Sequence, residues 1–151
     1  MINLNIIVEG QTEETFVRDV LAPYRGTRGI FAVARCVETG RKRGRIFRGG
    51  VRNYEKIRRD IKCWLNQRQD TYCTTMFDFY GLPKNFPGRT SIDSNQQARE
   101  RVKYIEKAFE KDIDTIRFIP YIQLHEFEAL LFAGIERLNV FYLEDKLKEI
   151  K

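Results

Sequence analysis

The sequence has no hydrophobic run long enough to cross a membrane, although 42% of its 151 residues are hydrophobic. A membrane-spanning helix needs about 20 consecutive, mostly apolar residues, and Glu9 interrupts the apolar stretch at the N-terminus. That end also lacks the basic residues that open a secretory signal peptide. We therefore expect a soluble, cytoplasmic protein that does not associate with membranes.

Cysteine and histidine are too scarce to build a zinc site. The three cysteines, Cys36, Cys63 and Cys73, contain no CxxC pair, and His125 is the only histidine. A structural zinc site takes its Cys and His ligands at regular short spacings. The sequence likewise shows no ligand pattern for haem or an iron–sulfur cluster. We expect three reduced, buried thiols, since free cysteine is among the most buried residue types.

Acidic residues are scarce in the first half of the chain, which is therefore strongly basic. Residues 1–75 carry fifteen basic and eight acidic side chains, whereas residues 76–151 carry twelve and thirteen. A Gly-rich tract at 40–52 holds six of the cations: Arg41, Lys42, Arg43, Arg45, Arg48 and Arg52. Such a tract binds polyanions through salt-dependent phosphate contacts, and Phe47 offers a ring for base stacking. We predict a loop here that binds nucleic acid; a solvated basic loop without a partner is the alternative.

Hydrophobic spacing predicts strands that alternate with helices along the chain. Four apolar segments are predicted as strands, at 3–8, 30–37, 72–78 and 117–124. Helices are expected from 12 to a stop at Pro23, over 54–67, from 98 onward, from 125 to 132, and over 138–151. This alternation is typical of a sheet covered by helices. We therefore expect one α/β domain over 1–151, with a mostly parallel four-stranded sheet flanked by helices.

Local signals predict where some of these elements begin. Thr12 is the expected N-cap of the first helix, whose apolar face includes Val20. The spacing of Ser94 and Gln97 matches a capping box at the start of a later helix. Pro120 favours an edge strand or a strand start for the fourth segment, because proline cannot donate a ladder hydrogen bond.

Acidic side chains follow three of the four predicted strands. Glu9 ends the first, Asp78 ends the third, and His125-Glu126 ends the fourth, while Glu13 lies one helical turn beyond Glu9. The carboxyl ends of parallel strands line a ligand-binding crevice, and carboxylates that converge there need a cation or a shared proton. Their oxygen atoms favour Mg²⁺ or Mn²⁺. We predict a metal site there; helix caps or ion pairs are the alternative.

Two neighbours of Glu126, His125 and Glu128, each have competing interpretations. His125 is a candidate metal ligand, general acid/base or phosphate donor, and a helix cap is the competing interpretation. Glu128 joins the candidate metal ligands only with an irregular backbone, since positions two apart on a helix point in different directions. The chain lacks GxxxxGK[ST], and no GxGxxG follows the first strand. A nucleotide-binding enzyme that uses the same crevice without these motifs stays open.

Several longer motifs resemble those of domain-of-unknown-function family 4276. They are VEGQTE at 8–13, FDFYGLP at 77–83, FPG at 86–88 and PYIQLHEFEALLF at 120–132. The resemblance covers nearly the whole chain, and the greater length of most members implies that a C-terminal part is missing. The family is considered Toprim-like and similar to the nuclease half of overcoming-lysogenization-defect proteins. Its members often occur beside ATPases in bacterial genome-defence settings.

This resemblance implies roles for several residues. Glu9 matches the Toprim glutamate, a general acid/base or metal partner, and Glu13 matches a second acidic residue of such nucleases. Asp78 matches the first aspartate of the Toprim Asp-x-Asp motif, but Tyr80 stands in the place of the second aspartate. The metal site would then recruit Glu126 instead, or it has lost metal and catalysis.

The resulting expectation is a Toprim-like, magnesium- or manganese-dependent nuclease that acts with a partner ATPase. Glu9, Asp78 and Glu126 would bind metal, Glu13 would support a second ion, and His125 would orient water or donate to a phosphate. The alternative is a non-catalytic Toprim-like module that binds nucleic acid or the ATPase and regulates it. A homo-oligomer is left open.

Overall fold

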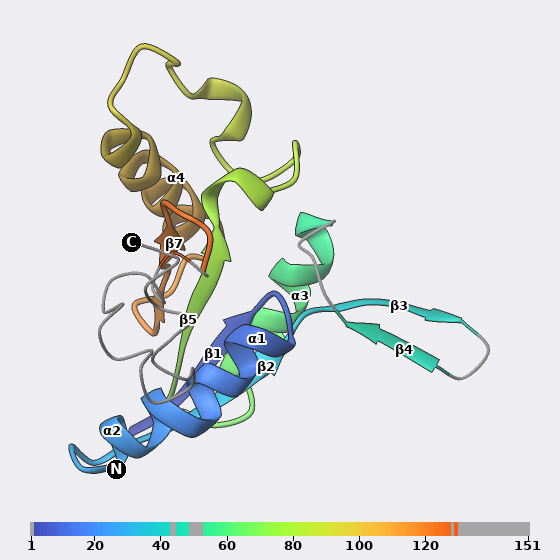
Figure 1. The fold of residues 1–151 in the computed structure, drawn as a ribbon, viewed down its shortest axis with the longest axis vertical. Coiled ribbons are helices and arrows are strands. Elements are labelled where there is room, and N and C mark those ends of the chain that lie inside the picture. The colour runs from blue at the N-terminus through green and yellow to red at the C-terminus, as the bar shows by residue number, and fades with distance from the viewer. Residues whose placement is uncertain (1, 43–44, 49–52, 128, 130–151) are drawn as a thin grey trace, which may run out of the picture.

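The computed structural model describes residues 2–42, 45–48, 53–127 and 129. A parallel sheet lies at its centre, in the order β2-β1-β5, with β6 and β7 paired to β5 (Figure 1). The strands are β1 (Ile2–Val8), β2 (Ile30–Cys36), β5 (Thr71–Asp78), β6 (Phe118–Ile119) and β7 (Ile122–Gln123). All four pairings in this sheet are parallel. The predicted α/β class with a mostly parallel sheet is confirmed.

The fourth predicted strand is interrupted in its middle. β6 and β7 pair with β5 in one continuous register, but Pro120 and Tyr121 between them leave the ladder. Thr75 of β5 spans this gap: its Oγ1 accepts from the Tyr121 N–H at 3.0 Å and donates to the Tyr121 carbonyl at 2.9 Å. Beside the gap, Glu106 accepts from the Ile122 N–H at 2.9 Å. The edge position that Pro120 favoured is confirmed.

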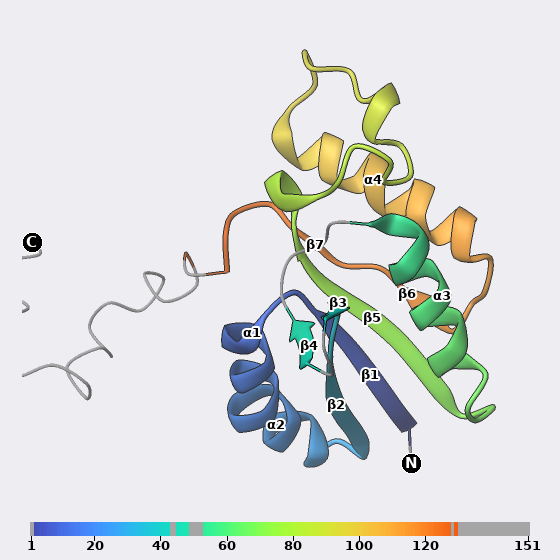
Figure 2. The same cartoon turned by 90° about the vertical axis from the view of Figure 1, so that its right-hand side faces the viewer.

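Helices cover both faces of the sheet (Figure 2). One face carries α1 (Gln11–Phe16), the π-helical turn η1 (Val17–Leu21) and α2 (Ala22–Gly26), and the other carries α3 (Tyr54–Leu65) and α4 (Ala98–Ile113). Side chains of β1 alternate between the two cores. Ile6 and Val8 pack with Val17 on the first face, while Ile7 joins the core under α3 and α4. This alternation is the two-residue period of a strand buried on both sides.

Aromatic rings fill the core beneath α3 and α4. Phe109 of α4 contacts Tyr54, Phe86 and Phe118 in edge-to-face geometry, with ring centroids 4.7–5.8 Å apart. Edge-to-face packing is the favoured arrangement of aromatic pairs. The ring of Phe86 thereby ties the long segment after β5 to the body of the domain.

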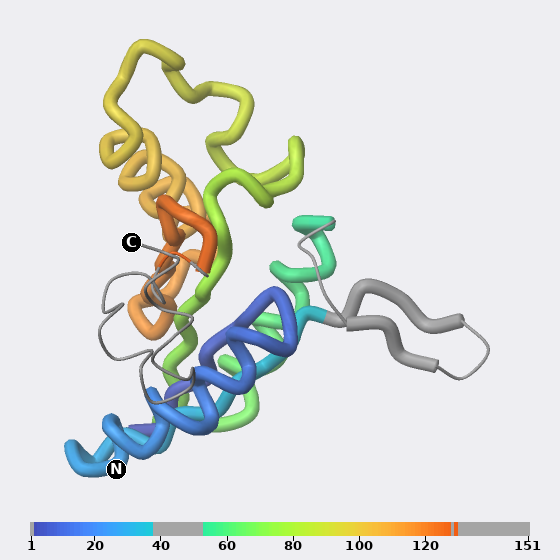
Figure 3. Tube along the Cα trace, viewed as in Figure 1, coloured from blue at the N-terminus to red at the C-terminus, as the bar shows by residue number. Residues whose placement is uncertain are grey.

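The first helix differs from its prediction in three ways. Its N-cap is Gly10 rather than Thr12, because the Glu13 carboxylate reaches back to the Gly10 N–H at 3.0 Å. Pro23 does not end the helical path; it lies in the first turn of α2, where a missing N–H is tolerated. Val20 is 54% exposed, since the π-helical turn shifts the faces of the positions after it. Figure 3 shows β1 turning directly into this helical path.

Other predicted boundaries are also corrected. The basic tract is not a loop throughout: β3 (Glu38–Lys42) and β4 (Arg45–Arg48) form an antiparallel hairpin. The predicted capping box is wrong, because α4 begins at Ala98 and Asp93 instead accepts from the Asn95 N–H in a tight turn. Residues 125–127 form a bend and turn rather than the start of a helix, and 138–151 lie outside the described residues.

The structure bears on two further predictions, the burial of the cysteines and the lack of a membrane-spanning segment. None of the three cysteines forms a disulfide with a described residue, but only Cys73 is buried; Cys36 is half-buried and Cys63 is exposed on α3. The prediction of a buried thiol is therefore wrong for Cys63, which lies on the solvent side of an amphipathic helix. Within the described part of the chain, no helix is both long and apolar enough to span a bilayer.

We expect Thr75→Val to destabilise the domain, because it leaves the Tyr121 N–H and C=O without their partner in a buried part of the sheet. The loss should be roughly 1–3 kcal/mol in the free energy of unfolding, measured by urea denaturation. Thr74→Val is the matched control: it makes the same change one position earlier, where the hydroxyl bonds no described residue. Equal losses in the two variants would contradict this role of Thr75.

Candidate functional site

Glu9 joins the carboxyl ends of two neighbouring strands. It follows Val8 at the end of β1, and its Oε1 accepts a hydrogen bond of 2.9 Å from the N–H of Asp78, the last residue of β5. Gly81 lies directly against this carboxylate, since a Cβ built there would stand 3.6 Å from both Glu9 oxygens. The site therefore lies at the edge of the sheet where parallel strands present their ligands.

The environment of Glu9 changes its acidity. Burial raises the pKa of Glu9 to about 7, the hydrogen bond from Asp78 N–H opposes this, and the charges of Asp78 and Glu13 raise it further. The charged form is thus desolvated and repelled by two other carboxylates. Such a group is stabilised by a proton or by a cation.

Glu13 reaches the same place from the first turn of α1. Its Oε2 accepts from Gly10 N–H, which fixes the side chain at the start of the helix. A Cβ on Gly10 would stand 3.2 Å from that oxygen, so a side chain there would require the Glu13 carboxylate to shift by a few tenths of an ångström. From this position the charge of Glu13 acts on Glu9.

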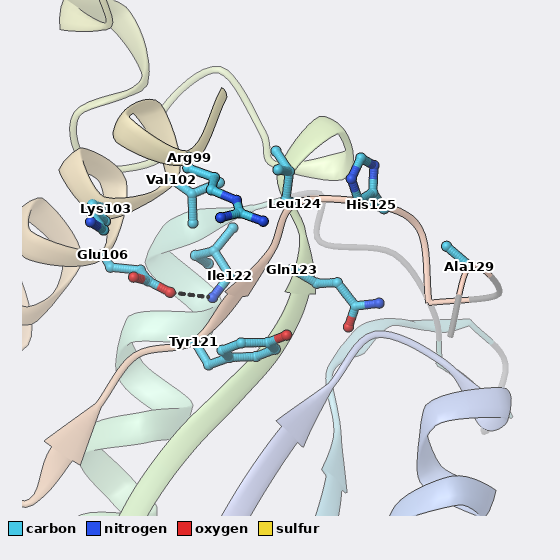
Figure 4. A pocket seen from close by; sticks show the side chains of 10 residues that line it. All are labelled: Arg99, Val102, Lys103, Glu106, Tyr121, Ile122, Gln123, Leu124, His125 and Ala129. Atoms are coloured by element: carbon cyan, nitrogen blue, oxygen red, sulfur yellow. Dashed lines mark hydrogen bonds between the residues drawn. The ribbon is translucent and has the colours of Figure 1, made fainter. Parts of the chain in front are cut away.

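Gln123 is a site residue that sequence reasoning missed. It pairs in register with Asp78 of β5. Its neighbour Ile122 packs in the core under α4, and side chains alternate along a strand, so Gln123 and Asp78 both lie on the face of the sheet that is turned away from α4. It is 5% exposed, and its Oε1 has no hydrogen-bond partner among the described residues. Figure 4 shows its amide pointing away from α4. The sequence contained one signal for this residue, an amide side chain two positions before His125 among the apolar residues of the predicted strand.

A buried amide oxygen without a partner is energetically unfavourable. A ligand that supplies a donor or a positive charge would relieve this cost. Gln123 therefore adds a neutral oxygen donor beside the two acidic strand ends.

His125 and Glu126 are exposed in the turn after β7. His125 lines a pocket of about 450 Å³ between α4 and this turn, together with Arg99 and Lys103 (Figure 4). Within the described ranges, no group of three His, Cys, Asp or Glu side chains is placed to hold a metal ion. The four predicted acidic ligands in those ranges therefore do not converge as a set, and Glu128 lies outside them.

Four of the six predicted nucleic-acid contacts belong to the β3–β4 hairpin. Arg41 and Lys42 belong to β3, and Arg45 and Arg48 belong to β4. This hairpin extends from the end of β2 to one side of the sheet (Figure 1). Arg43 and Arg52 lie outside the described residues.

Tyr80 lies two residues beyond Asp78, in the 3₁₀ turn that follows β5. It is 60% exposed, and its ring packs edge-to-face on Phe79 with centroids 5.2 Å apart. The phenol thus faces solvent next to Asp78 and supplies no carboxylate there.

Comparison with known proteins gives one match. The model of a family described as a domain of unknown function, DUF4276, matches residues 8–151. No curated protein and no solved structure matches the chain.

The raised pKa of Glu9 predicts a pH-dependent stability. The folded protein retains a proton that the unfolded chain releases near pH 4.5, so the free energy of unfolding should fall as pH rises from 4.5 to about 7. Glu9→Gln should remove this loss, which we expect to be on the order of 2 kcal/mol because the carboxylate is partly screened by solvent. The measurement is urea unfolding in EDTA at several pH values.

Glu14→Gln, which removes a carboxylate from α1, is the control and should follow the wild type. Parallel pH profiles for wild type and Glu9→Gln would show that Glu9 titrates normally and would contradict the prediction.

Proposed function

The chain belongs to the family of the domain of unknown function DUF4276, and we propose that this member is a magnesium- or manganese-dependent nuclease. The observation that supports the proposal most directly is the half-buried Glu9 carboxylate, tied to the end of β5, whose pKa is raised first by burial and then by the charges of Asp78 and Glu13. Carboxylates held together at the ends of adjacent parallel strands are suited to a hard divalent cation.

In this proposal, side chains at the ends of three strands would supply the oxygen ligands of the cation. Glu9 and Asp78 would hold it through their carboxylates, and the unpartnered Oε1 of Gln123 would add a neutral oxygen. Glu13 would support a second ion. When bound, the cation polarises a phosphoryl oxygen and lowers the pKa of a water molecule.

The remaining roles fall to side chains at the rim. His125 and Glu126 are exposed beside the site, so in this proposal they meet the substrate, and His125 orients the attacking water or donates to a phosphate oxygen. The cations of the β3–β4 hairpin would contact the nucleic-acid backbone. The excess of positive charge in residues 1–75 supports a polyanionic substrate.

The resemblance to nucleases of genome-defence systems supports a partner ATPase as part of the same proposal. In that arrangement the ATPase would deliver the substrate to the acidic site. The domain itself would supply the metal ligands and the phosphate contacts.

A second candidate is a non-catalytic module that binds nucleic acid or the ATPase. Two observations favour it: Tyr80 replaces the second aspartate, and the described residues contain no group of three acidic, Cys or His side chains arranged for a metal. Such a module would bind nucleic acid without cleaving it.

Manganese binding is the first test, because metal affinity requires no partner protein. We expect saturable binding in calorimetry, weakened at least tenfold, or about 1.4 kcal/mol, by Glu9→Gln and by Asp78→Asn. Affinity should rise with pH through about 7, since the metal displaces the proton held by Glu9. Glu14→Gln is the control that removes a nearby carboxylate. An equal loss in this control, or no binding by folded wild type, would count against the metal site.

Cleavage is the second test. We expect Mn²⁺-dependent cleavage of labelled DNA or RNA that Glu9→Gln abolishes while nucleic-acid binding survives, because Glu9 lies in the reaction centre and not in the basic hairpin. The readout is gel electrophoresis of the products beside a binding titration. Binding that Arg45→Glu weakens, without cleavage by any variant, would instead support the non-catalytic module.

A further inference from the structure

Two arginines from distant parts of the chain meet over one ring next to the acidic site. Phe79 follows Asp78 at the end of β5, and it is 2% exposed. The guanidinium of Arg89 lies 5.2 Å from the centroid of this ring, and that of Arg101 lies 5.6 Å from it. Arg89 begins a 3₁₀ turn after Gly88, whereas Arg101 belongs to the first turns of α4. Figure 2 shows the end of β5 beside the start of α4.

The segment before Arg89 fixes that arginine in place. Gly88 has φ of 78° and packs so closely on α4 that a Cβ would stand 3.0 Å from the Cβ of Ala108. The Arg89 N–H then bonds the Phe86 carbonyl at 3.0 Å, and its Nη1 bonds the Phe79 carbonyl at 3.2 Å. The FPG motif at 86–88 therefore fixes the Arg89 guanidinium beside Phe79.

Neither arginine is neutralised by the described part of the protein. No carboxylate there forms an ion pair with Arg89 or Arg101, and the buried Nε of Arg101 has no hydrogen-bond acceptor. Arg58, by contrast, pairs with Asp112 at 2.7 Å, and Arg117 donates to three carbonyls. Arg101 thus differs from arginines that serve the fold, whereas Arg89 gives one N–H to the Phe79 carbonyl and forms no ion pair with the described residues.

Contact with the Phe79 ring stabilises each positive charge but uses none of its N–H donors. Arg89 gives one N–H to the Phe79 carbonyl, and its other donors, with those of Arg101, stay available for an anion with several oxygen acceptors. A guanidinium fork matches a phosphate in geometry. An anion placed here would also supply the acceptor that the Arg101 Nε lacks.

We propose that Arg89 and Arg101 form a phosphate clamp, which binds the backbone of a nucleic-acid strand beside Glu9 and Asp78. The clamp deepens the proposed nuclease function and rests on it for the identity of the ligand. The ring that both arginines contact follows Asp78 in the chain, and in this proposal the clamp holds a phosphate that neighbours the one at the acidic centre. It is separate from the basic hairpin, and it sets where the strand lies relative to the acidic residues.

The test is fluorescence anisotropy of the full chain with a short labelled single-stranded DNA, in EDTA so that no cleavage occurs. Arg89→Gln and Arg101→Gln should each weaken the affinity about tenfold, and each should lower the slope of log Kd against log salt by about 0.7, the value for one lost contact to a single strand. Arg101→Lys should recover the slope but only part of the affinity, because lysine keeps the charge and lacks the fork.

Arg99→Gln is the matched control, since it removes the same charge two residues away, where the side chain lines the pocket between α4 and β7. It should weaken binding less than Arg101→Gln. Equal losses would reduce the effect to net charge and would overturn the clamp, as would unchanged affinity in both clamp variants. Circular dichroism verifies that each variant is folded.

Two further outcomes show whether the ligand is a nucleic-acid strand or a smaller anion, and whether the clamp or the nuclease proposal has failed. If the clamp variants lose affinity for ATP or inorganic phosphate but keep their affinity for DNA, the assignment to a nucleic-acid strand is overturned. If wild type never cleaves, yet the clamp variants lose DNA affinity and salt slope as expected, the nuclease proposal fails and the clamp stands.

Discussion

The hydrogen bond between the Glu9 carboxylate and the Asp78 N–H is the contact on which the arrangement of the site depends. It satisfies one oxygen of a buried carboxylate and fixes the end of β1 against the end of β5. Gly81 lies beside the same carboxylate, where a Cβ would stand 3.6 Å from both Glu9 oxygens. The segment from Asp78 to Gly81 therefore contributes three neighbours of the Glu9 carboxylate: the Asp78 N–H, the Asp78 carboxylate and Gly81. Because the same contact leaves Glu9 desolvated next to Asp78 and Glu13, the geometry of the fold also sets the chemistry of the site.

Much of the fold could be predicted because it follows from hydrophobic periodicity. Apolar runs located the three long strands, and the spacing of Ile57 and Ile61 or of Val102, Ile105 and Phe109 located the buried faces of α3 and α4. The interrupted edge strand could not be predicted, since its replacement contacts come from Thr75, a residue more than forty positions away. The hairpin in the basic tract was missed for a different reason: glycine and arginine dominate it, and they give no strand signal.

The residues of the candidate site also fall into two groups: those that a local sequence pattern identifies and those that depend on contacts between distant parts of the chain. Glu9, Glu13 and Asp78 could be found from the sequence, because acidic residues at the ends of predicted parallel strands share one edge. Gln123 depends on the register between β5 and β7, which a single sequence does not contain. Arg89 and Arg101 depend on long-range packing around Phe79. The sequence therefore identifies acidic side chains near a strand end, whereas neutral and basic groups are assigned only after the chain is folded.

The two edges of the sheet have different capacities for association. On one edge, Pro120 removes a donor, Thr75 occupies the Tyr121 backbone, and Glu106 covers the Ile122 N–H. Proline and charged side chains at an edge are common means by which proteins prevent strands of other molecules from adding to it. The opposite edge is β2, a strand of seven residues whose only described pairing is with β1. Addition of a foreign strand is therefore opposed beside α4, whereas at the other edge the described residues pair β2 with β1 alone.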